Sequence, residues 1–176
     1  YYRTKDQSLR KDEYKKALSK LQKLNLIYPC WLSRSEAINS ATAPVGKINH
    51  VITDTDLILS ENDILMRKKA GFTPAWRLRM KSAINFAKSI NNDFYWNDIY
   101  LGKINLDPEP YGDVIIARKD ISTSYHLSVT IDDNSDNITH VTRGNDLIES
   151  THIHRLLQII LSLKTTTWFH HPLIFN

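Results

Sequence analysis

The sequence contains little cysteine, glycine or proline. Its 176 residues include 1 Cys, 5 Gly and 6 Pro, which excludes an internal disulfide, a site that needs two thiolates, and a low-complexity or fibrous chain. No apolar run approaches the roughly 20 residues that a membrane-spanning helix needs. The longest, at 156–161, is interrupted by Gln158. We therefore expect a globular protein of the cytoplasm with no membrane partner.

The chain also lacks the usual features of a complete protein. It begins with Tyr1 rather than Met, shows no signal-peptide pattern, and finishes on residues 171–176, which resemble the start of a strand. A length of 176 residues predicts one domain or slightly more. We expect the chain to be a piece of a longer protein.

Common nucleotide-binding and catalytic motifs are missing. Neither G-x-G-x-x-G nor G-x-x-x-x-G-K-[ST] occurs, which excludes phosphate sites of those two types within these residues. Cys30 lies between a proline and a tryptophan, a setting more typical of packing than of a catalytic thiol. Asp132 and Asp133 could form an acid–base or metal-binding pair, but their Asn, Ser and Asp neighbours favour turn chemistry.

Four histidines near the C-terminus raise the question of a metal site, because neutral imidazole is a common zinc ligand. His152 and His154 are two positions apart, which on a helix separates them by about 200°. His170 and His171 are adjacent, so on a strand they point to opposite faces. These spacings favour core or surface histidines, and we predict no metal site.

Hydrophobic periodicity predicts a mixture of helices and strands. The clearest helix has Ser8 as its N-cap and apolar residues at positions 14, 17, 18, 21 and 24, and a second helix runs from Ser60 to Gly71. The end of the chain predicts a strand, a helix and a strand, which together form a βαβ unit. Further predicted elements are a short helix at 35–40, strands at 48–53, 76–80, 113–117, 125–131 and 138–142, a helix capped by Ser150 or Thr151, and a strand at 168–175.

Basic residues cluster although the net charge is only +4. Alternation in the strand at 76–80 places Arg77, Arg79 and Lys81 on an outer face. With the basic residues at 67–69 and 118–119, they could hold RNA phosphates while nearby aromatic residues stack on unpaired bases. The alternative interpretation is a solvated surface.

Two long stretches, at 112–129 and 138–158, resemble the catalytic region of the class I glutamyl-tRNA synthetases in both order and spacing. The second stretch and residues 170–174 are most similar to the shorter paralogues in this family, which attach glutamate to queuosine in tRNA(Asp) and lack an anticodon-binding domain. Residues 28–30 and 75–78 fit the same family, so the resemblance covers nearly the whole chain.

The resemblance implies an α/β fold. It would be a Rossmann-like class I synthetase catalytic domain split by an α+β insertion, with its N-terminal part missing. Residues 1–29 would be a remnant of the first half of the nucleotide-binding domain, and 30–137 would form an inserted domain like those that bind the acceptor stem. Residues 138–176 would form the second half, the βαβ unit.

The resemblance also implies an activity for the complete enzyme. Members condense glutamate with ATP, supplied as its magnesium complex, release pyrophosphate and transfer the glutamyl group to tRNA. The favoured acceptor is queuosine of tRNA(Asp), and we expect a monomer. The alternatives are a glutamyl-tRNA synthetase domain that charges tRNA(Glu), and a non-catalytic tRNA-binding remnant.

Five residues correspond to binding positions of the family, and none to a catalytic residue. Tyr125 and Arg143 match positions that hold glutamate, and an arginine suits that role because its planar fork can pair with both oxygens of a carboxylate. Leu147, Leu173 and Ile174 match positions that lie against the adenosine of ATP.

The sequence departs from the family in three respects. The family's His-x-Gly-His motif lies upstream of these residues, and its Lys-x-Ser-Lys loop lies downstream of them. Relatives of the shorter type often carry a zinc site that begins Cys-x-Cys, but Trp31 and Leu32 follow Cys30 and no later cysteine exists. We therefore expect no zinc, and no adenylate formation by these 176 residues alone.

Overall fold

A computed structural model describes residues 6–32, 36, 59–120 and 123–173. The helices are α1 (Lys11–Lys23), α3 (Glu61–Lys69), α4 (Met80–Ile90), α5 (Tyr125–Ser135) and α6 (Ile148–Leu161), with single 3₁₀ turns η1 (Gln7–Leu9), η3 (Glu109–Tyr111) and η4 (Asn145–Leu147). The strands are β1 (Ile27–Cys30), β2 (Ala75–Leu78), β3 (Tyr95–Asp98), β4 (Gly102–Asn105), β5 (Ile115–Ala117), β6 (His140–Gly144) and β7 (Thr167–His171). None of these helices is long and apolar enough to cross a membrane.

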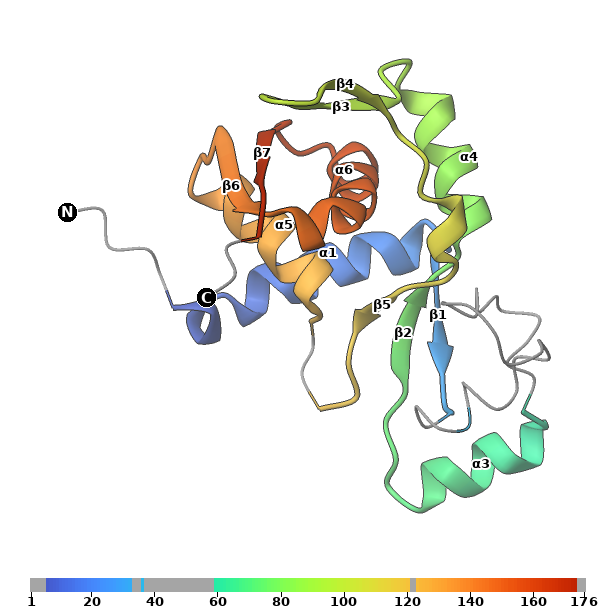
Figure 1. Cartoon of the computed structure of the whole chain (residues 1–176). Coiled ribbons are helices and arrows are strands. Elements are labelled where there is room, and N and C mark those ends of the chain that lie inside the picture. Colours follow the sequence, from blue (N-terminus) through green and yellow to red (C-terminus); the bar gives the residue numbers. More distant parts are fainter. Residues whose placement is uncertain (1–5, 33–35, 37–58, 121–122, 174–176) are drawn as a thin grey trace.

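The strands form two sheets. One is antiparallel, with the order β1-β2-β5, and the other has the order β4-β3-β7-β6. In the second sheet β7 is parallel to both β6 and β3, and the register with β6 runs from His140↔Thr167 to Gly144↔His171. Because α6 connects β6 to β7, the predicted βαβ unit is confirmed, and the molecule has the expected α/β character (Figure 1).

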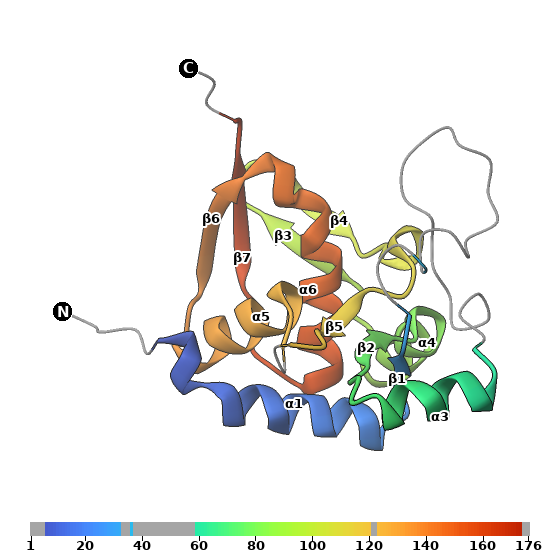
Figure 2. The same cartoon turned by 90° about the horizontal axis from the view of Figure 1, so that it is seen from below.

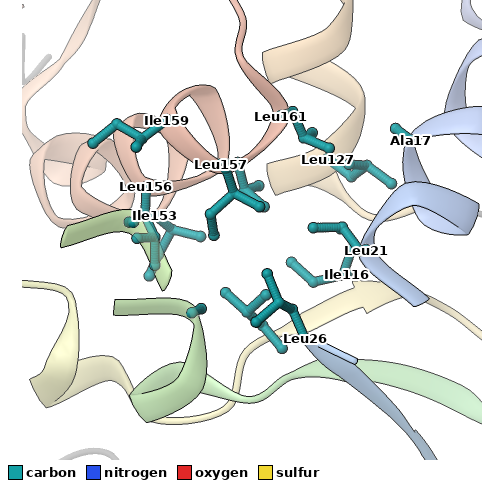
Figure 3. Packing of buried hydrophobic residues seen from close by; sticks show 14 of the residues in the cluster. Ala17, Leu21, Leu26, Ile116, Leu127, Ile153, Leu156, Leu157, Ile159 and Leu161 are labelled. Carbon is teal, nitrogen blue, oxygen red and sulfur yellow. The ribbon is translucent and has the colours of Figure 1, made fainter. Parts of the chain in front are cut away.

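Helix α6 lies at the centre of the core. Its residues from Ile153 to Leu161 are all buried. Figure 3 shows Leu157 of α6 facing Leu21 and Leu127, which belong to α1 and α5. Figure 2 shows α1 running along one edge of the molecule beside α5 and α6. One apolar cluster thus joins the beginning, middle and end of the chain.

Polar contacts fix α5 against α1. The Arg10 guanidinium donates to both carboxylate oxygens of Asp136, at 2.6 and 2.7 Å. The Tyr14 hydroxyl donates to Asp132 Oδ1 at 2.7 Å, and Gln7 Nε2 donates to the other oxygen of Asp132. Asp132 and Asp133 are therefore helical residues of α5, and the predicted turn at this pair is wrong.

The strand predicted at 125–131 is also wrong, because these residues form α5. The Ser124 hydroxyl accepts a hydrogen bond from Leu127 N–H and caps the helix. Leu127 and Ile131 are buried four positions apart, the spacing of a helical face. The apolar and β-branched composition favoured a strand, but the cap and the packing against α1 and α6 outweigh that local preference.

The basic outer face predicted at 76–80 does not form. Strand β2 ends at Leu78 and α4 begins at Met80, so the alternation stops before it reaches Lys81. Arg77 is only 9% exposed and donates to the Asp113 carbonyl oxygen at 2.7 Å. The guanidinium of Arg79 packs over the Tyr28 ring at 4.8 Å. Two of the three predicted RNA-facing side chains thus have structural contacts.

The predicted helix boundaries agree only in part with the observed ones. Ser60 caps α3 through Asp63 N–H, and Gly71 has the positive φ of a helix C-terminal glycine, as predicted. Ser8 lies in η1, and α1 begins only at Lys11. Helix α6 begins at Ile148, so neither Ser150 nor Thr151 is its cap. Strand β7 ends at His171, whereas the predicted strand continues to residue 175. The strand predicted at 48–53 lies outside the described residues, and so does the helix predicted at 35–40 apart from Glu36.

Candidate functional site

The candidate site lies where β6 and β7 end. Arg143 is the fourth residue of β6 and His170 the fourth residue of β7, so the parallel register places them side by side. Helix α6 adds Thr151 and His154, and the first turn of α5 adds Tyr125. The carboxyl ends of parallel strands are the usual place for ligands in open α/β sheets.

The Arg143 guanidinium is held by hydrogen bonds to four neutral side chains. Its Nε donates to His170 Nε2 at 3.1 Å, and its Nη2 donates to the Thr151 hydroxyl at 2.5 Å. Its Nη1 lies 3.4 Å from the Tyr125 hydroxyl and 3.2 Å from His154 Nδ1. Tyr125 and Arg143, which the sequence predicts as a pair, are thus brought together.

No carboxylate forms an ion pair with Arg143 among the residues that the structure describes. Burial lowers the pKa of this guanidinium, and the neighbouring Tyr125 hydroxyl and the carboxylates of Asp133 and Asp146 partly offset that effect. A partly buried positive charge with no carboxylate in direct contact is costly. The site therefore favours an anionic ligand, and the planar fork of arginine suits a carboxylate.

The hydrogen-bond pattern determines the tautomers of three histidines. Arginine can only donate, so His170 Nε2 and His154 Nδ1 must both accept. The His170 proton is then on Nδ1 and is donated to Asp98 Oδ2 at 2.7 Å. The His154 proton is on Nε2 and is donated to His126 Nδ1 at 3.2 Å.

All three histidines are neutral in this arrangement. Burial, together with the positive charge of Arg143, lowers the pKa of His126 to about 4. Burial, followed by the charge of Arg143, also lowers the pKa of His154 well below its ordinary value. Burial lowers the pKa of His170 despite its hydrogen bond to Asp98. Arg143 thus carries the positive charge of the cluster.

Asp98 supports the site from the end of β3. Its side chain and that of His170 are fully buried. One carboxylate oxygen accepts from the backbone N–H groups of Tyr100 and Leu101, and the other accepts from the backbone and ring of His170. Burial raises the pKa of Asp98, but the hydrogen bonds from Leu101, His170 and Tyr100 outweigh it and leave the pKa below its ordinary value.

Tyr125 forms the open side of the site. It is 46% exposed, and its ring lies edge-on to that of His154 with centroids 5.5 Å apart. A cavity of about 820 Å³ opens beside it, bounded by the start of α5 and by residues of α1 such as Lys11 and Lys15. A ligand held by Arg143 would therefore meet an accessible aromatic hydroxyl.

The predicted adenosine-facing residues are only partly described. Leu173 lies so close to Gly144 that a Cβ on this glycine would be 3.1 Å from Leu173 Cδ2. Leu173 thus packs against the residue that follows Arg143 in β6. Leu147 is half-buried at the start of α6. Ile174 lies outside the described residues, and the assignment of these three positions to ATP stays a prediction.

The other residues that the sequence raises as possible metal ligands, nucleophiles or RNA contacts are packed in the fold or paired with neighbouring residues. His152 accepts a hydrogen bond from Asp107 N–H and packs edge-on against Trp96, away from His154. Cys30 is buried in β1. Of the basic groups, Arg118 pairs with Asp120. Within the described ranges, no group of three or more His, Cys, Asp or Glu side chains could hold a metal ion.

Sequence reasoning missed Asp98, Thr151, His154 and His170 as members of the site. Asp98 and His170 are 72 residues apart, and no local pattern links them. The available signal was that the two strands were predicted as parallel partners of one βαβ unit. The predicted bounds put Arg143 after the first strand and His170 near the start of the second, so they did not predict the contact that the observed register gives.

The whole chain, residues 1–176, matches the family described as tRNA synthetases class I (E and Q), catalytic domain. It is 34% identical to a glutamyl-Q tRNA(Asp) synthetase of Rhodobacter capsulatus, over 96% of this chain and 61% of that protein. It is 31% identical to a glutamate–tRNA ligase of Corynebacterium diphtheriae, over 94% of this chain and 32% of that protein. Thus the chain spans only about half to three-fifths of the glutamyl-Q relatives that it matches.

The fold is similar to that of solved relatives. A crystal structure of a glutamate tRNA ligase from Elizabethkingia meningosepticum, in complex with its amino acid, superposes with a TM-score of 0.73. Sequence identity to that protein is 21%, and the match covers 99% of this chain and 35% of the other. A second ligase, from Elizabethkingia anophelis, gives a TM-score of 0.71.

Proposed function

Because the chain belongs to the catalytic-domain family of class I tRNA synthetases of the E and Q type, we propose that it is the glutamate-binding part of an enzyme that activates glutamate with ATP. The complete enzyme then transfers the glutamyl group to queuosine of tRNA(Asp). We propose further that it works as a monomer in the cytoplasm.

The observation that carries this proposal is the set of partners of Arg143. Four neutral side chains orient the guanidinium, and no described carboxylate forms an ion pair with it. These partners occupy four of the five N–H groups of arginine, so a carboxylate of glutamate would accept a charge-assisted hydrogen bond from the remaining N–H on Nη2. The Tyr125 hydroxyl, 3.4 Å from Nη1, would add a second contact.

Glutamate has two carboxylates, and the chemistry assigns them different roles. An oxygen of the α-carboxylate attacks the α-phosphorus of ATP, an anhydride bond forms, and pyrophosphate leaves with the electrons of the broken P–O bond. The α-carboxylate must stay free for this attack, so Arg143 would pair with the side-chain carboxylate. Catalysis then rests on positioning and on charge stabilisation rather than on covalent chemistry by a side chain.

ATP enters as its magnesium complex, which is a substrate. Leu147, Leu173 and Ile174 would lie against the adenosine. The position of Leu173 against Gly144 supports this assignment, because it puts an apolar surface next to the proposed glutamate pocket. The groups that grip the phosphates in the family belong to two motifs that these residues lack. We therefore expect the chain to bind glutamate without forming adenylate.

Calorimetric titration of the 176-residue chain tests the pocket. We expect glutamate to bind, and Arg143→Gln to weaken binding by about tenfold or more, because a charged hydrogen-bonded pair contributes about 1.5–3 kcal/mol. Arg67→Gln is the matched control, since Arg67 belongs to α3 and pairs with Glu36. Equal affinity of wild type and Arg143→Gln for glutamate would contradict the pocket.

Pyrophosphate exchange tests the proposal that these residues do not form adenylate. We expect no glutamate-dependent exchange by the 176 residues alone, and robust exchange would show that the two absent motifs are not required. In the full-length protein, glutamylation of tRNA(Asp) that carries queuosine, but not of tRNA(Glu), would support the proposed acceptor. The reverse result would support an ordinary glutamyl-tRNA synthetase, the kind of enzyme named for the relative from Corynebacterium diphtheriae.

Binding without chemistry is the remaining alternative. If the full-length protein binds tRNA(Asp) with a steep salt dependence but never activates glutamate, the chain belongs to a non-catalytic RNA-binding protein. A full-length protein that lacks both family motifs would favour this alternative, whereas the lack of a described carboxylate in ion-pair contact with Arg143 favours glutamate binding.

A further inference from the structure

We propose that Asp98 and His170 are positioning residues that fix the orientation of Arg143 for its ligand. The inference rests on the proposed glutamate pocket. It adds that the β3–β4 hairpin, which the sequence assigns to the inserted domain, determines the geometry of an arginine in the second half of the nucleotide-binding domain.

The first step is that Asp98 can only act as an acceptor here. Both of its oxygens receive backbone N–H groups, from Tyr100 and Leu101 on one side and from His170 on the other. The same oxygen that receives His170 N–H also receives the His170 ring at 2.7 Å. This four-bond arrangement requires an ionised carboxylate and forces the ring proton onto Nδ1.

The second step is that the His170 tautomer controls Arg143. With its proton on Nδ1, His170 presents a lone pair on Nε2, which accepts from Arg143 Nε at 3.1 Å. The Thr151 hydroxyl, 3.1 Å from the same nitrogen, can donate to it while accepting from Arg143 Nη2. With the proton on Nε2 instead, two N–H groups would face each other and the guanidinium would have to turn away.

The third step is that the hairpin cannot shift independently of β7. Asp98 is paired with Trp168 in the parallel ladder, and Ile99 N–H donates to the Trp168 carbonyl oxygen at 2.7 Å. Trp96 packs edge-on against both Trp168 and His170. Backbone pairing and aromatic packing therefore hold the carboxylate at a fixed position relative to the imidazole ring.

Nitrogen-15 NMR of the wild-type chain tests the tautomer directly. Long-range proton–nitrogen spectra distinguish a protonated from an unprotonated ring nitrogen. We expect His170 to carry its proton on Nδ1 and the Arg143 Nε–H to be protected from solvent exchange. A His170 proton on Nε2 would overturn the proposal, and this measurement needs neither a variant nor a ligand.

Two variants separate positioning from a merely structural role. Asp98→Asn preserves shape but places an NH₂ group among four donors, so we expect the His170 tautomer to change and glutamate affinity to fall about tenfold, the loss of one hydrogen bond to a charged group. His170→Gln keeps a donor for Asp98 and an acceptor for Arg143, so we expect an affinity within about threefold of wild type. His140→Gln, at the exposed start of β6, is the control.

The outcomes remain distinguishable. An unchanged tautomer and affinity in Asp98→Asn would overturn the positioning role. If that variant fails to fold, the wild-type tautomer and the affinity of His170→Gln decide the question. If the wild type shows the expected tautomer but binds no glutamate, the proposed function fails while the positioning of Arg143 stands.

Discussion

Individual side chains determine how this protein should respond to pH. His126 and His154 share a hydrogen bond and are neutral when folded, because burial lowers the pKa of each. Asp133, on the same helix as His126, has a pKa that burial and the adjacent Asp132 raise to about 6. The two kinds of group affect stability in opposite directions.

The sign of each effect follows from which state binds more protons. Between the folded pKa of about 4 for His126 and its ordinary value of 6.5, the unfolded chain binds more protons, so stability is lost as pH falls. Between the ordinary value of 3.8 for Asp133 and its folded pKa of about 6, the folded chain binds more, so stability falls as pH rises. The two slopes oppose each other between about pH 4 and 6.

We predict that Asp133→Asn makes the protein more acid-sensitive. Removing the carboxyl leaves only the histidine effect, so the free energy of unfolding should fall more steeply from pH 6 to pH 4, by up to about 3 kcal/mol relative to wild type. Urea denaturation at a series of pH values measures the slope. Asp12→Asn, at an exposed residue of α1, is the control, and parallel curves for Asp133→Asn and wild type would contradict the assignment.

At the scale of elements, the sequence patterns predicted some helices and missed others. Helices α1 and α6 and the βαβ unit were predicted because their apolar spacing agrees with the final packing, and α3 was predicted from its Ser60 cap. Helix α4 was not predicted although its apolar face is buried. Helix α5 was mistaken for a strand because its helical state depends on contacts with α1 and α6. The prediction of a basic outer face on β2 was wrong because the Arg77 side chain donates to the backbone carbonyl oxygen of Asp113, which lies in a distant segment.

The N-cap of α5 should matter more than that of α3. Ser124→Ala removes the acceptor for Leu127 N–H, and because α5 has buried residues we expect the free energy of global unfolding to fall by about 1 kcal/mol. Ser60→Ala removes the same kind of cap from α3, which has no buried residue, so the global value should change less. Equal losses in thermal or urea denaturation would contradict the difference assigned to packing.

At the scale of the whole molecule, segments distant in the sequence share one core. Leu21, Leu127 and Leu157 come from α1, α5 and α6 and are fully buried in the same cluster. The predicted division at 30–137 puts α5 on the inserted side, although it packs against α1 and α6. That division stays a prediction, and the packing suggests measuring whether the parts unfold together.

We predict a single cooperative unfolding transition that is sensitive to Leu157. Leu157→Ala leaves a cavity where three helices meet, and should lower the free energy of unfolding by about 2–5 kcal/mol. Leu65→Ala, at a residue 47% exposed on α3, should change it by about 0.5 kcal/mol or less. Circular dichroism and tryptophan fluorescence should give one midpoint for each variant. Two separated midpoints in the wild type would contradict a shared core.

The buried link between Asp98 and His170 also constrains the order of assembly. Its partners come from the β3–β4 hairpin and from β7, so the link cannot form until the chain has been made through His171 and the hairpin has docked on β7. A chain that stops before β7 would lack the His170 acceptor of Arg143 Nε. Ligand binding would thereby report on completed folding, and immature chains would not sequester glutamate.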